Sequence, residues 1–510
     1  MIFELIKDKS SRRGVILNLE QLFNHIKFKH VIGTFSDAQI NKITQDTREV
    51  ESGDVFICIE GANFDGHGYA AQAMEKGAIA VVARKQLDIN VPVIYVNDTT
   101  KAMAMLANAF YGYPSDKLKM IGITGTNGKT TTTYIIEAIL KGLKLGSGVI
   151  GTVGIKVNDT FIPTINTTPD SITLQRVFKE MDDENVAVCA MEVSSQALVK
   201  GRVWGVDFDV AVMTNLTHEH MELHHTMEAY QAAKKLLFSQ MGNSYKTAKV
   251  AVLNKDDETF EDYREATVGE VLSYSILDSE SDFFATNIHY FESHTTFDLV
   301  YLNETYAVHS NLVGEYNVSN LLAGMASVFA LGYTLTEIVA TIPSLLGVSG
   351  RMELAAKADD ISLYVDYAHS PDAMEKVLAT VKNIAKGKVI AVFGCTGKRE
   401  FEKRPIMTKI GIEQADFAVL TTDEAMGEEQ AEIWEMMKPG IPEGAKNYAY
   451  YENRVEAIYK AIEMAEPGDI VLMMGRGNDT RYYDSNGWIY HFTDKEAAVN
   501  GMNRRTLLQE

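Results

Sequence analysis

The sequence predicts an α/β protein of three domains, and three observations carry that prediction. The chain has 510 residues, which is too long for one ordinary hydrophobic core. Short apolar runs alternate with helical stretches along most of its length, as in sheets covered by helices. One apolar run continues into a glycine-rich turn that ends in Gly-Lys-Thr, which is typical of a phosphate-binding loop.

The first domain is expected over residues 1–112. Two apolar runs there, "DVFICIEG" and "AIAVVAR", predict buried strands, and "AAQAMEKG" between them predicts a helix. The segment "YGYPSDKLK" predicts a linker to the next strand. The sequence therefore indicates a small α/β domain at the N-terminal end.

The second domain is expected over residues 113–347. Its strands are predicted by "MIGITG", "VAVCAMEVSS", "FDVAVMTNLT" and "VAVLN", and "NVSNLLAGMASVFAL" predicts a later helix. The alternation of strands and helices argues for a mostly parallel sheet with helices on its faces. The segment "LLGVSGRMEL" marks the boundary to the third domain.

The third domain is expected over residues 348–510. Four apolar strands, "LYVDYAHS", "VIAVFGCTG", "FAVLTTD" and "DIVLMMGRG", each end in a polar or glycine-rich loop. That pattern is typical of a doubly wound, Rossmann-like domain, whose ligand loops lie at the carboxyl ends of the strands.

The composition restricts the partners of the protein. A formal net charge of -21 argues against a general nucleic-acid surface, because a phosphate backbone would be repelled. The three cysteines, at positions 58, 189 and 395, are too far apart to indicate a disulfide framework or a zinc site. We find neither a secretory signal nor an apolar run that would span a bilayer. We therefore expect a cytoplasmic protein without nucleic-acid binding or membrane insertion.

The phosphate loop, "GTNGKTT", is shorter than the usual one. Two residues separate Gly125 from Gly128, whereas the standard motif has four between its first glycine and the Gly-Lys pair. Consecutive backbone N–H groups at a helix N-terminus can point at phosphate oxygens. Lys129 adds a positive charge, and the Thr130 hydroxyl can ligate Mg²⁺. The second domain is therefore predicted to be a P-loop ATPase domain.

Three further features of the second domain carry side chains that could bind a metal ion or take part in chemistry. Glu192 ends an apolar strand, where a carboxylate is costly unless it is paired or bound to a metal, so a Mg²⁺ role fits. Four histidines lie between residues 218 and 225; without cysteines or an HExxH spacing, metal ligation and surface positions stay equally open. Lys234 follows on a predicted helix, where partial burial would lower its pKa. Its position alone nevertheless indicates an ordinary lysine of an amphipathic helix.

Together these motifs resemble the Mur ligase family, the ATP-dependent amide-forming enzymes of peptidoglycan synthesis. The resemblance covers nearly the whole chain, and the shortened loop is the form found in that family. The most similar branch adds the third amino acid to UDP-MurNAc-L-Ala-D-Glu. The text typical of that branch comprises "DTREVESGDVFICIEG", "NTTPDSITLQ", "MEVSSQALVKGRV", "TNLTHEHMELHHTMEAYQAAK", "GVSGRMEL", "YVDYAHSPDAM" and "GCTGKREFEKRPIM".

The resemblance implies a role for each matching residue. ATP would be bound by Gly125, Thr126, Asn127, Gly128, Lys129, Thr130, Thr131, Asn320, Arg351 and Asp366. Magnesium would be held by Thr130, Glu192, His220 and Lys234, the last after its reaction with CO₂ to a carbamate. The UDP-substrate would contact Thr47, Arg48, Asn166, Thr167, Thr168, Ser194, Lys200 and Arg202. The acceptor amino acid would contact Arg399, Asp423, Glu424, Gly475 and Asp479. The catalytic residues would be Lys129, Glu192, His220 and Lys234.

The implied reaction is the ATP-dependent formation of an amide bond. ATP converts the D-Glu γ-carboxylate into an acyl phosphate, the incoming amine attacks it, and phosphate leaves. Magnesium ions and Lys129 would offset the charge that builds where two anions meet. ATP and Mg²⁺ are thus the expected cofactors. UDP-MurNAc-dipeptide and a free amino acid are the expected partners of a monomeric enzyme.

The sequence departs from the family pattern at three motifs. One is the family's "GKGHE", which reads "GRGND" over residues 475–479, so that Asp479 stands in place of the longer glutamate. The family's "RDHLDYHGT" reads "HEHMELHHT" here, which places histidines at positions 218 and 225. Enzymes that use meso-diaminopimelate carry Asp-Asn-Pro-Arg, whose arginine pairs with the distal carboxylate of that substrate. The corresponding residues here are Asp423, Glu424, Ala425 and Met426. Met426 cannot bind a carboxylate and Glu424 would attract an ammonium, which favours L-lysine or another diamine as acceptor.

Three alternative functions stay open. One is a paralogue of the same branch with another acceptor, because the usual lysine-type motifs are not matched either. Another is a ligase like folylpolyglutamate synthase, which lacks a separate N-terminal uridine domain, so residues 1–112 count against it. The third is a non-catalytic nucleotide-binding scaffold, which would not need Lys129, Glu192, His220 and Lys234 together.

Overall fold

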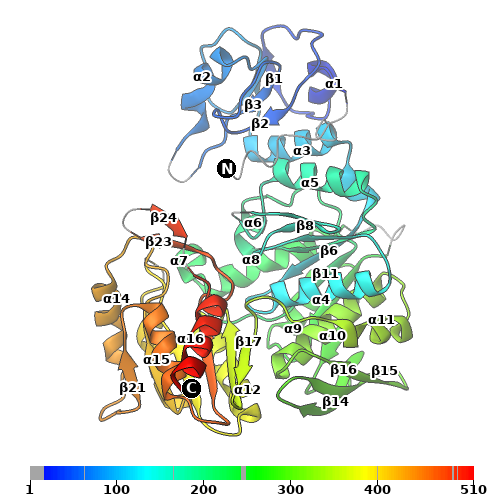
Figure 1. Ribbon diagram of the computed structural model, residues 1–510. Helices are drawn as coiled ribbons and strands as arrows, with labels where there is room; N and C mark the ends of the chain where they lie inside the picture. Colours follow the sequence, from blue (N-terminus) through cyan, green and yellow to red (C-terminus); the bar gives the residue numbers. More distant parts are fainter. Residues whose placement is uncertain are drawn as a thin grey trace.

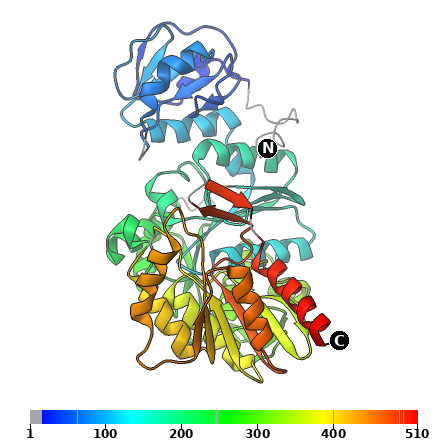
Figure 2. The same ribbon diagram turned by 60° about the vertical axis from the view of Figure 1, so that its left-hand side comes forward.

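The computed structural model describes residues 16–61, 64–164, 166–242, 248–398, 400–484, 487–490 and 492–509. Its chain forms three α/β domains, as predicted. Figure 1 shows the N-terminal domain at one end of the central domain, and the C-terminal domain beside the central one. In the turned view of Figure 2 the N-terminal domain again lies at one end, and the C-terminal domain lies in front of the central one. Within the described residues, no helix combines the length and the apolar character needed to cross a membrane.

The N-terminal domain is built on a five-stranded sheet of order β1-β5-β4-β3-β2, parallel except for β1. Its strands are β1 (His30–Ile32), β2 (Ile43–Thr44), β3 (Val55–Ile57), β4 (Ala80–Ala83) and β5 (Val93–Tyr95). Its helices are α1 (Leu19–Phe23), the short 3₁₀ turn η2 (Gly66–Tyr69), α2 (Ala70–Glu75) and α3 (Thr99–Tyr111). The two predicted strands are β3 and β4, and the predicted helix between them is α2. Helix α3 packs against α5 of the central domain and joins the two domains (Figure 1).

The central domain contains an eleven-stranded sheet of order β16-β15-β14-β13-β12-β11-β6-β10-β7-β8-β9. The strands from β7 to β14 in that order pair in parallel, so the predicted mostly parallel sheet is confirmed. Antiparallel strands extend both edges, which the sequence analysis did not predict. The strands are β6 (Lys119–Thr124), β7 (Ser147–Ile150), β8 (Ile155–Val157), β9 (Thr160–Ile162), β10 (Val188–Glu192), β11 (Val210–Met213), β12 (Val250–Asn254), β13 (Glu270–Ser275), β14 (Phe283–Tyr290), β15 (Thr295–Tyr301) and β16 (Glu304–Ser310).

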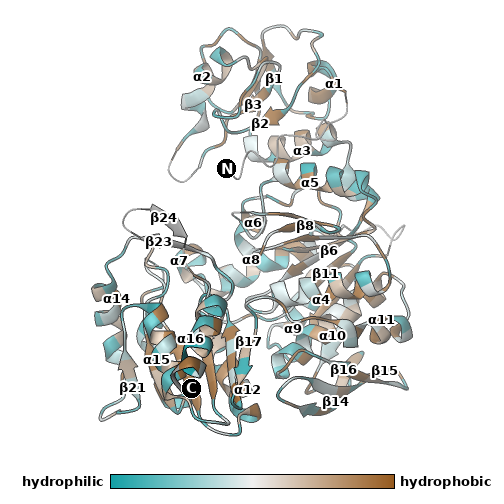
Figure 3. Cartoon of the chain, in the orientation of Figure 1, coloured by the Kyte–Doolittle hydropathy of each residue, from teal (hydrophilic) through white to brown (hydrophobic). Residues whose placement is uncertain are grey.

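Helices cover both faces of the central sheet. They are α4 (Lys129–Gly142), α5 (Ser171–Asp183), α6 (Ser195–Val199), α7 (Met221–His224), α8 (Met227–Ser239), α9 (Phe260–Ala266), α10 (Glu315–Ala330) and α11 (Leu335–Thr341). Side chains of β6 alternate between the two faces: Ile121 packs with α4 and α10, and Met120 packs with α5 and α8. Figure 3 shows brown, hydrophobic strands in the central sheet and helices of mixed colour over it. Strand β6 therefore lies between two hydrophobic cores, one on each face of the central sheet.

The C-terminal domain is doubly wound, as predicted. Its six-stranded sheet has the order β17-β18-β22-β19-β20-β21, parallel apart from β17 at the edge. The strands are β17 (Glu353–Ala358), β18 (Ile361–Asp366), β19 (Val389–Phe393), β20 (Phe417–Leu420), β21 (Tyr448–Tyr450) and β22 (Ile470–Met474), and a separate ribbon pairs β23 (Arg481–Asp484) with β24 (Gly487–Tyr490). The helices are α12 (Pro371–Ile384), α13 (Lys403–Gln414), α14 (Gln430–Met437), α15 (Arg454–Met464) and α16 (Asp494–Gln509). The four strands predicted from apolar runs are β18, β19, β20 and β22.

The connections between the domains are short. A 3₁₀ turn, η3 (Pro114–Lys117), lies between α3 and β6, and a second one, η4 (Ile342–Ser344), precedes the passage to β17. The boundaries expected at residues 112 and 347 fall within these connections and stay predictions.

Candidate functional site

The phosphate loop lies between the end of β6 and the start of α4. Gly125 and Gly128 have φ angles of +143° and +86°, which side chains with a Cβ rarely adopt. A Cβ at Gly125 would also overlap the Thr214 hydroxyl. The Thr126 N–H donates to the Asn215 carbonyl oxygen at 2.8 Å, which ties the loop to the chain after β11. The loop is therefore fixed from both sides at the carboxyl ends of parallel strands, where ligands bind in such sheets.

Lys129 is folded back onto the loop that carries it. Its Nζ donates to the carbonyl oxygens of Gly125 and Thr126 at 2.9 and 2.7 Å. Removal from water lowers the pKa of Lys129 below its usual value. A phosphate oxygen is a stronger partner for an ammonium than a neutral carbonyl. The geometry therefore suits exchange of these two carbonyl oxygens for an anionic ligand.

Glu192 and Thr130 meet beside this loop. The Thr130 hydroxyl donates to Glu192 Oε1 at 2.9 Å. The Thr152 N–H donates to the same oxygen at 2.9 Å, and the Thr152 hydroxyl donates to Oε2 at 3.1 Å. Glu192 is 1% exposed, so its charge needs this support. A buried carboxylate beside a hydroxyl is a donor set that suits Mg²⁺, which prefers oxygen ligands.

Lys234 lies beneath the phosphate loop on α8. Only 1% of it is exposed, its Nζ donates to the Gly125 carbonyl oxygen at 2.7 Å, and it stands 4.4 Å from the centroid of the Tyr230 ring. Burial lowers the pKa of Lys234 well below its usual value, and the charge of Lys129 adds to the effect. The position is thus not that of an ordinary surface lysine, and the amine is neutral more readily than a solvated one.

His220 lies in an acidic cluster. Its Nε2 is 3.7 Å from Glu219 and its Nδ1 is 3.6 Å from Glu222, while its N–H donates to Glu400 Oε1 of the C-terminal domain at 2.6 Å. Burial would raise the pKa of Glu219, but its bond and charge interaction with His369 and nearby cations lower it well below its usual range. His220, Glu222 and Glu400 offer ligand atoms within 4.8 Å of one another. No hydrogen bond or ion pair among the described residues joins His220 to the pair of Thr130 and Glu192.

A cavity of about 760 Å³ lies between the central and C-terminal domains, large enough for a nucleotide. Six predicted ATP-binding residues line it: Asn127, Gly128, Thr131, Asn320, Arg351 and Asp366. Other lining residues belong to no motif predicted from the sequence, among them Tyr290, Tyr316, Asp257, Lys376 and Asn383. These residues come from separate elements, and only the fold brings them together.

Arg351 and Asp366 connect the cavity to the linking segment between the domains. The Arg351 guanidinium lies over the Tyr367 ring, 4.2 Å from its centroid, and reaches Thr130 Oγ1 at 3.4 Å. Asp366 accepts from the N–H groups of Met352 and Ala368, both at 2.7 Å. Burial raises the pKa of Asp366 above its usual value. Arg351 and Asp366 thus lie where the C-terminal domain meets the central domain.

The residues predicted to bind the UDP-substrate fall into two groups. The group beside Glu192 is connected: the Thr168 hydroxyl donates to the Glu192 carbonyl oxygen at 2.9 Å, the Ser194 N–H donates to Thr168 Oγ1 at 3.1 Å, and Arg202 donates to the Thr168 carbonyl oxygen at 2.8 Å. Thr167 and Thr152 share a hydroxyl–hydroxyl bond of 3.0 Å. The remaining two members of this group, Asn166 and Lys200, are exposed.

Thr47 and Arg48 form the other group, in the N-terminal domain after β2. Arg48 pairs with Asp46, and this hydrogen bond lowers the pKa of that carboxyl. The Thr47 carbonyl oxygen accepts from Lys76 at 2.7 Å. These contacts are local to the N-terminal domain, and no hydrogen bond or ion pair among the described residues joins Thr47 or Arg48 to the phosphate loop.

The residues predicted to bind the acceptor lie on loops after β20 and β22. Asp423 Oδ1 accepts from the Glu424 N–H at 2.6 Å, while Asp423 Oδ2 is buried against Gly475 without a hydrogen-bond partner among the described residues. The Asp479 N–H donates to the Arg476 carbonyl oxygen at 2.9 Å. Arg399 lies outside the described residues. An unsatisfied buried carboxylate oxygen suits a ligand that donates hydrogen bonds.

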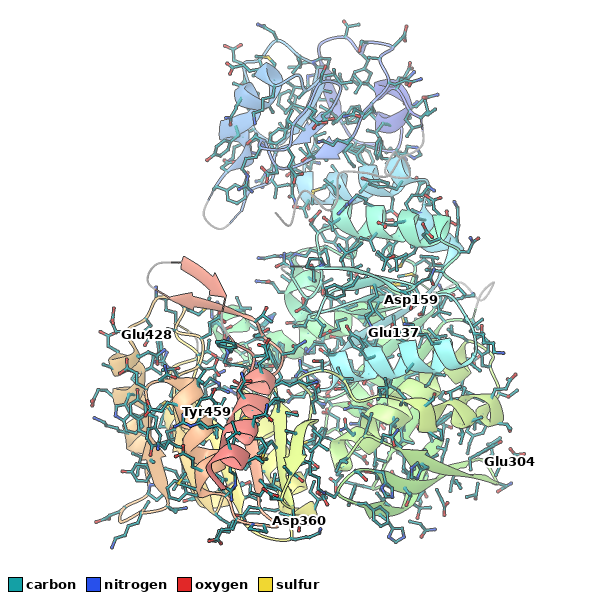
Figure 4. The ribbon with its side chains drawn as sticks, in the orientation of Figure 1. Glu137, Asp159, Glu304, Asp360, Glu428 and Tyr459 are labelled. Carbon is teal, nitrogen blue, oxygen red and sulfur yellow. The ribbon has the colours of Figure 1, made fainter. Side chains whose placement is uncertain are left out.

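Two buried arginines that the sequence analysis missed hold these loops. Arg454 pairs with Asp494 of α16 at 2.8 and 2.6 Å and donates to the carbonyl oxygens of Thr422 and Met474 at 3.0 and 2.8 Å. Arg404 makes two bonds of 2.7 Å to Glu428, which Figure 4 labels in the C-terminal domain. The partners lie 40 and 24 positions away in sequence, so no local motif revealed them.

The backbone at His225 gives a prediction about stability. His225 follows α7 with a φ of 65°, a conformation that favours glycine. We expect His225→Gly to raise the free energy of unfolding by about 0.5–1 kcal/mol, because relief of backbone strain exceeds the added entropy of the unfolded chain. Urea unfolding measures this. His218→Gly is the matched control, since that histidine is exposed and has no positive φ. Equal destabilisation by both changes would contradict the prediction.

Comparison with known proteins relates this geometry to characterised families. Three family models match the chain: "Mur ligase family, catalytic domain" over residues 39–111, "Mur ligase middle domain" over 123–328, and "Mur ligase, glutamate ligase domain" over 350–477. A Lactiplantibacillus plantarum protein named "UDP-N-acetylmuramoyl-L-alanyl-D-glutamate--2,6-diaminopimelate ligase" is 43% identical over 490 residues, covering 95% of this chain and 99% of that protein.

Two solved structures resemble the chain over most of its length. A structure of an enzyme with that same name has a TM-score of 0.70 and 29% identity, covering 96% of this chain and 100% of that one. The structure of MurF ligase from Thermotoga maritima in complex with ADP has a TM-score of 0.66, covering 92% of this chain and 98% of that one. Its identity of 18% makes it a likeness of fold alone.

Proposed function

This chain belongs to the Mur ligase family of ATP-dependent ligases, and from that premise we propose that it is a MurE-type enzyme of peptidoglycan synthesis. In this proposal it adds the third amino acid, L-lysine, to UDP-MurNAc-L-Ala-D-Glu. The observation that carries the proposal is the meeting of Lys129, Lys234 and the pair of Thr130 and Glu192 around one loop. A monomeric state stays a prediction.

The residues of this loop would serve the first half of the reaction. The D-Glu γ-carboxylate attacks the terminal phosphorus of ATP, ADP leaves, and an acyl phosphate forms. Lys129 would stabilise the negative charge on the phosphoryl oxygens during that transfer. Mg²⁺, held by Thr130 and Glu192, would supply further positive charge where the two anions meet. The acceptor amine then attacks the acyl carbon, loses a proton, and displaces phosphate.

The burial of Lys234 supports its proposed carbamylation. A neutral amine reacts with CO₂ to form a carbamate and release a proton, whereas an ammonium has no free electron pair for the attack. The lowered pKa of Lys234 therefore favours the reactive form. The carbamate would add a negative oxygen donor beside the phosphate loop, as a second magnesium position requires. Its negative charge would also be attracted to the nearby ammonium of Lys129.

The acceptor loops favour an ammonium over a distal carboxylate. Asp423 Oδ2 is buried and without a hydrogen-bond partner among the described residues, so a donor such as an ammonium would satisfy it. Met426 follows at the position of the arginine in the family's diaminopimelate motif and offers no charge to a carboxylate. The name of the Lactiplantibacillus plantarum relative favours 2,6-diaminopimelate instead, which makes it the second candidate.

A substrate panel tests the proposal. Phosphate release from ATP is measured with UDP-MurNAc-L-Ala-D-Glu and, in turn, L-lysine, L-ornithine or meso-diaminopimelate, and each product is weighed by mass spectrometry. Turnover with lysine supports the proposal. Turnover with diaminopimelate alone assigns the second candidate, and the absence of a product with every acceptor contradicts the proposed reaction.

Met426 gives a prediction about acceptor choice. We expect Met426→Arg to raise kcat/KM for meso-diaminopimelate relative to lysine by about 10-fold, because a new charge-assisted bond to the distal carboxylate is worth about 1.5 kcal/mol or more. The panel above measures the ratio. Met426→Leu is the matched control, since it changes shape without charge. An unchanged ratio in the arginine variant would show that Met426 does not face the distal group.

A further inference from the structure

A hydrogen bond joins the C-terminal domain directly to the phosphate loop. Asn127 Nδ2 donates to Asp372 Oδ2 at 3.0 Å, although the two residues are 245 positions apart. Asn127 is in the central domain, and Asp372 is in the first turn of α12 in the C-terminal domain. The bond lies at the wall of the cavity, which Asn127 lines.

The backbone of Asn127 is held by further hydrogen bonds, apart from the bond of its side chain. Its N–H donates to Asn215 Oδ1 at 2.9 Å. Its carbonyl oxygen accepts from the Thr214 hydroxyl at 2.6 Å and from Asn215 Nδ2 at 3.1 Å. The backbone of Asn127 is therefore held by the residues that follow β11. A group that binds the Asn127 side chain is consequently fixed in position relative to the phosphate loop.

Asp372 is held on its own side as well. Lys376, one turn later on α12, has its Nζ 2.9 Å from Asp372 Oδ1 and 3.0 Å from Oδ2. A carboxylate in the first turn of a helix is also favoured by the helix dipole. The Asp372 carboxylate is thus oriented by its ion pair with Lys376, and its bond to the Asn127 amide is a charge-assisted one.

The segment that precedes Asp372 makes a second contact with the central domain. His369 Nε2 is 3.3 Å from Glu219 Oε1. His369, in the connection between β18 and α12, and Asp372, in the first turn of α12, therefore contact two different residues of the central domain, Glu219 and Asn127. Two contacts so close together in sequence restrict rotation as well as separation of the two domains.

We propose that Asp372 is a positioning residue that keeps the C-terminal domain closed on the phosphate loop through Asn127. The inference rests on the proposed function, in which an amine carried by the C-terminal loops must reach an acyl phosphate formed at this loop. Asp372 itself contacts neither reactant in this role. It raises the fraction of molecules whose acceptor loops stand at transfer distance, as closing contacts in enzymes do.

The distance between the domains tests the proposal without any substrate. Cysteines introduced at the exposed Asp159 and Glu443 carry fluorophores, because the native cysteines are buried. We expect Asp372→Ala to lower energy transfer between the labels, since one closing contact is lost. Asp372→Asn keeps an oxygen that accepts from Asn127 and should restore most of the transfer. Glu375→Ala removes an exposed carboxylate from the same helix and should leave it unchanged.

Kinetic measurements distinguish a positioning role of Asp372 from a merely structural one. For Asp372→Ala we expect kcat/KM for the acceptor to fall about tenfold, with the melting temperature unchanged. Asn127→Ala is the second variant, and the losses of the double variant should not add, because each change breaks the same bond. Additive losses, or energy transfer in Asp372→Ala equal to that of the unchanged chain, would overturn the proposal. Energy transfer is measured without ATP or acceptor, so this result stays distinct from a failure of the proposed reaction.

Discussion

Replacement of Lys129 by alanine should lower kcat/KM for ATP-dependent phosphate release by about 10²- to 10³-fold. The expectation follows from the cost of removing one charge-stabilising donor from a preorganised site, about 2.7–4 kcal/mol. Lys129 Nζ already lies on the loop, bonded to two carbonyl oxygens, so little rearrangement separates it from a phosphate. Its charge also helps to lower the pKa of Lys234, so the variant weakens a second feature of the site.

The measurement is the rate of phosphate release with all three substrates present, together with ATP affinity by calorimetry. Lys382→Ala is the matched control, because that lysine is exposed on α12 and does not line the cavity. Activity of Lys129→Ala within threefold of the unchanged chain would show that this lysine does not serve the phosphates.

Replacement of Lys234 by glutamine should lower turnover by about 100-fold. It should also prevent formation of the proposed carbamate on this side chain. Glutamine keeps a donor for the Gly125 carbonyl oxygen, so the fold of the loop is preserved, but its amide nitrogen does not react with CO₂. Loss of one negative ligand from a charge-stabilising site is expected to cost about 2.7 kcal/mol or more, by analogy with the loss of one donor.

Carbon-13 bicarbonate and NMR provide the measurement. The unchanged chain should show a carbamate carbonyl signal, and Lys234→Gln should lack it. Lys235→Gln is the control, since the neighbouring lysine is partly exposed and pairs with Asp262 at 2.8 Å. A signal that survives in Lys234→Gln, or disappears only in Lys235→Gln, would place the modification elsewhere.

The local motifs predicted the elements around the site well. Glycines at positions that need a positive φ, a lysine and a threonine at a helix start, and a carboxylate at a strand end are all properties of short stretches of chain. The apolar runs of the C-terminal domain likewise correspond to four buried parallel strands, because strands buried on both faces are continuously apolar.

Features that depend on distant residues could not be predicted in this way. The antiparallel strands at the edges of the central sheet, the partners of Arg454 and Arg404, and the meeting of Glu400 with His220 arise from segments far apart in sequence. Lys234 is the clearest case. Its sequence surroundings are those of a surface helix, and only packing beneath the phosphate loop removes it from water.

The pairing of Arg454 with Asp494 connects the last helix, α16, to the loops that follow β20 and β22. Because Arg454 also holds the carbonyl oxygens of Thr422 and Met474, a change in α16 reaches the acceptor loops without touching them. In the proposed function we therefore expect substitutions on α16, a helix outside the pocket, to alter acceptor choice. A search for variants with a new acceptor should include the start of α16 as well as the loop that carries Met426.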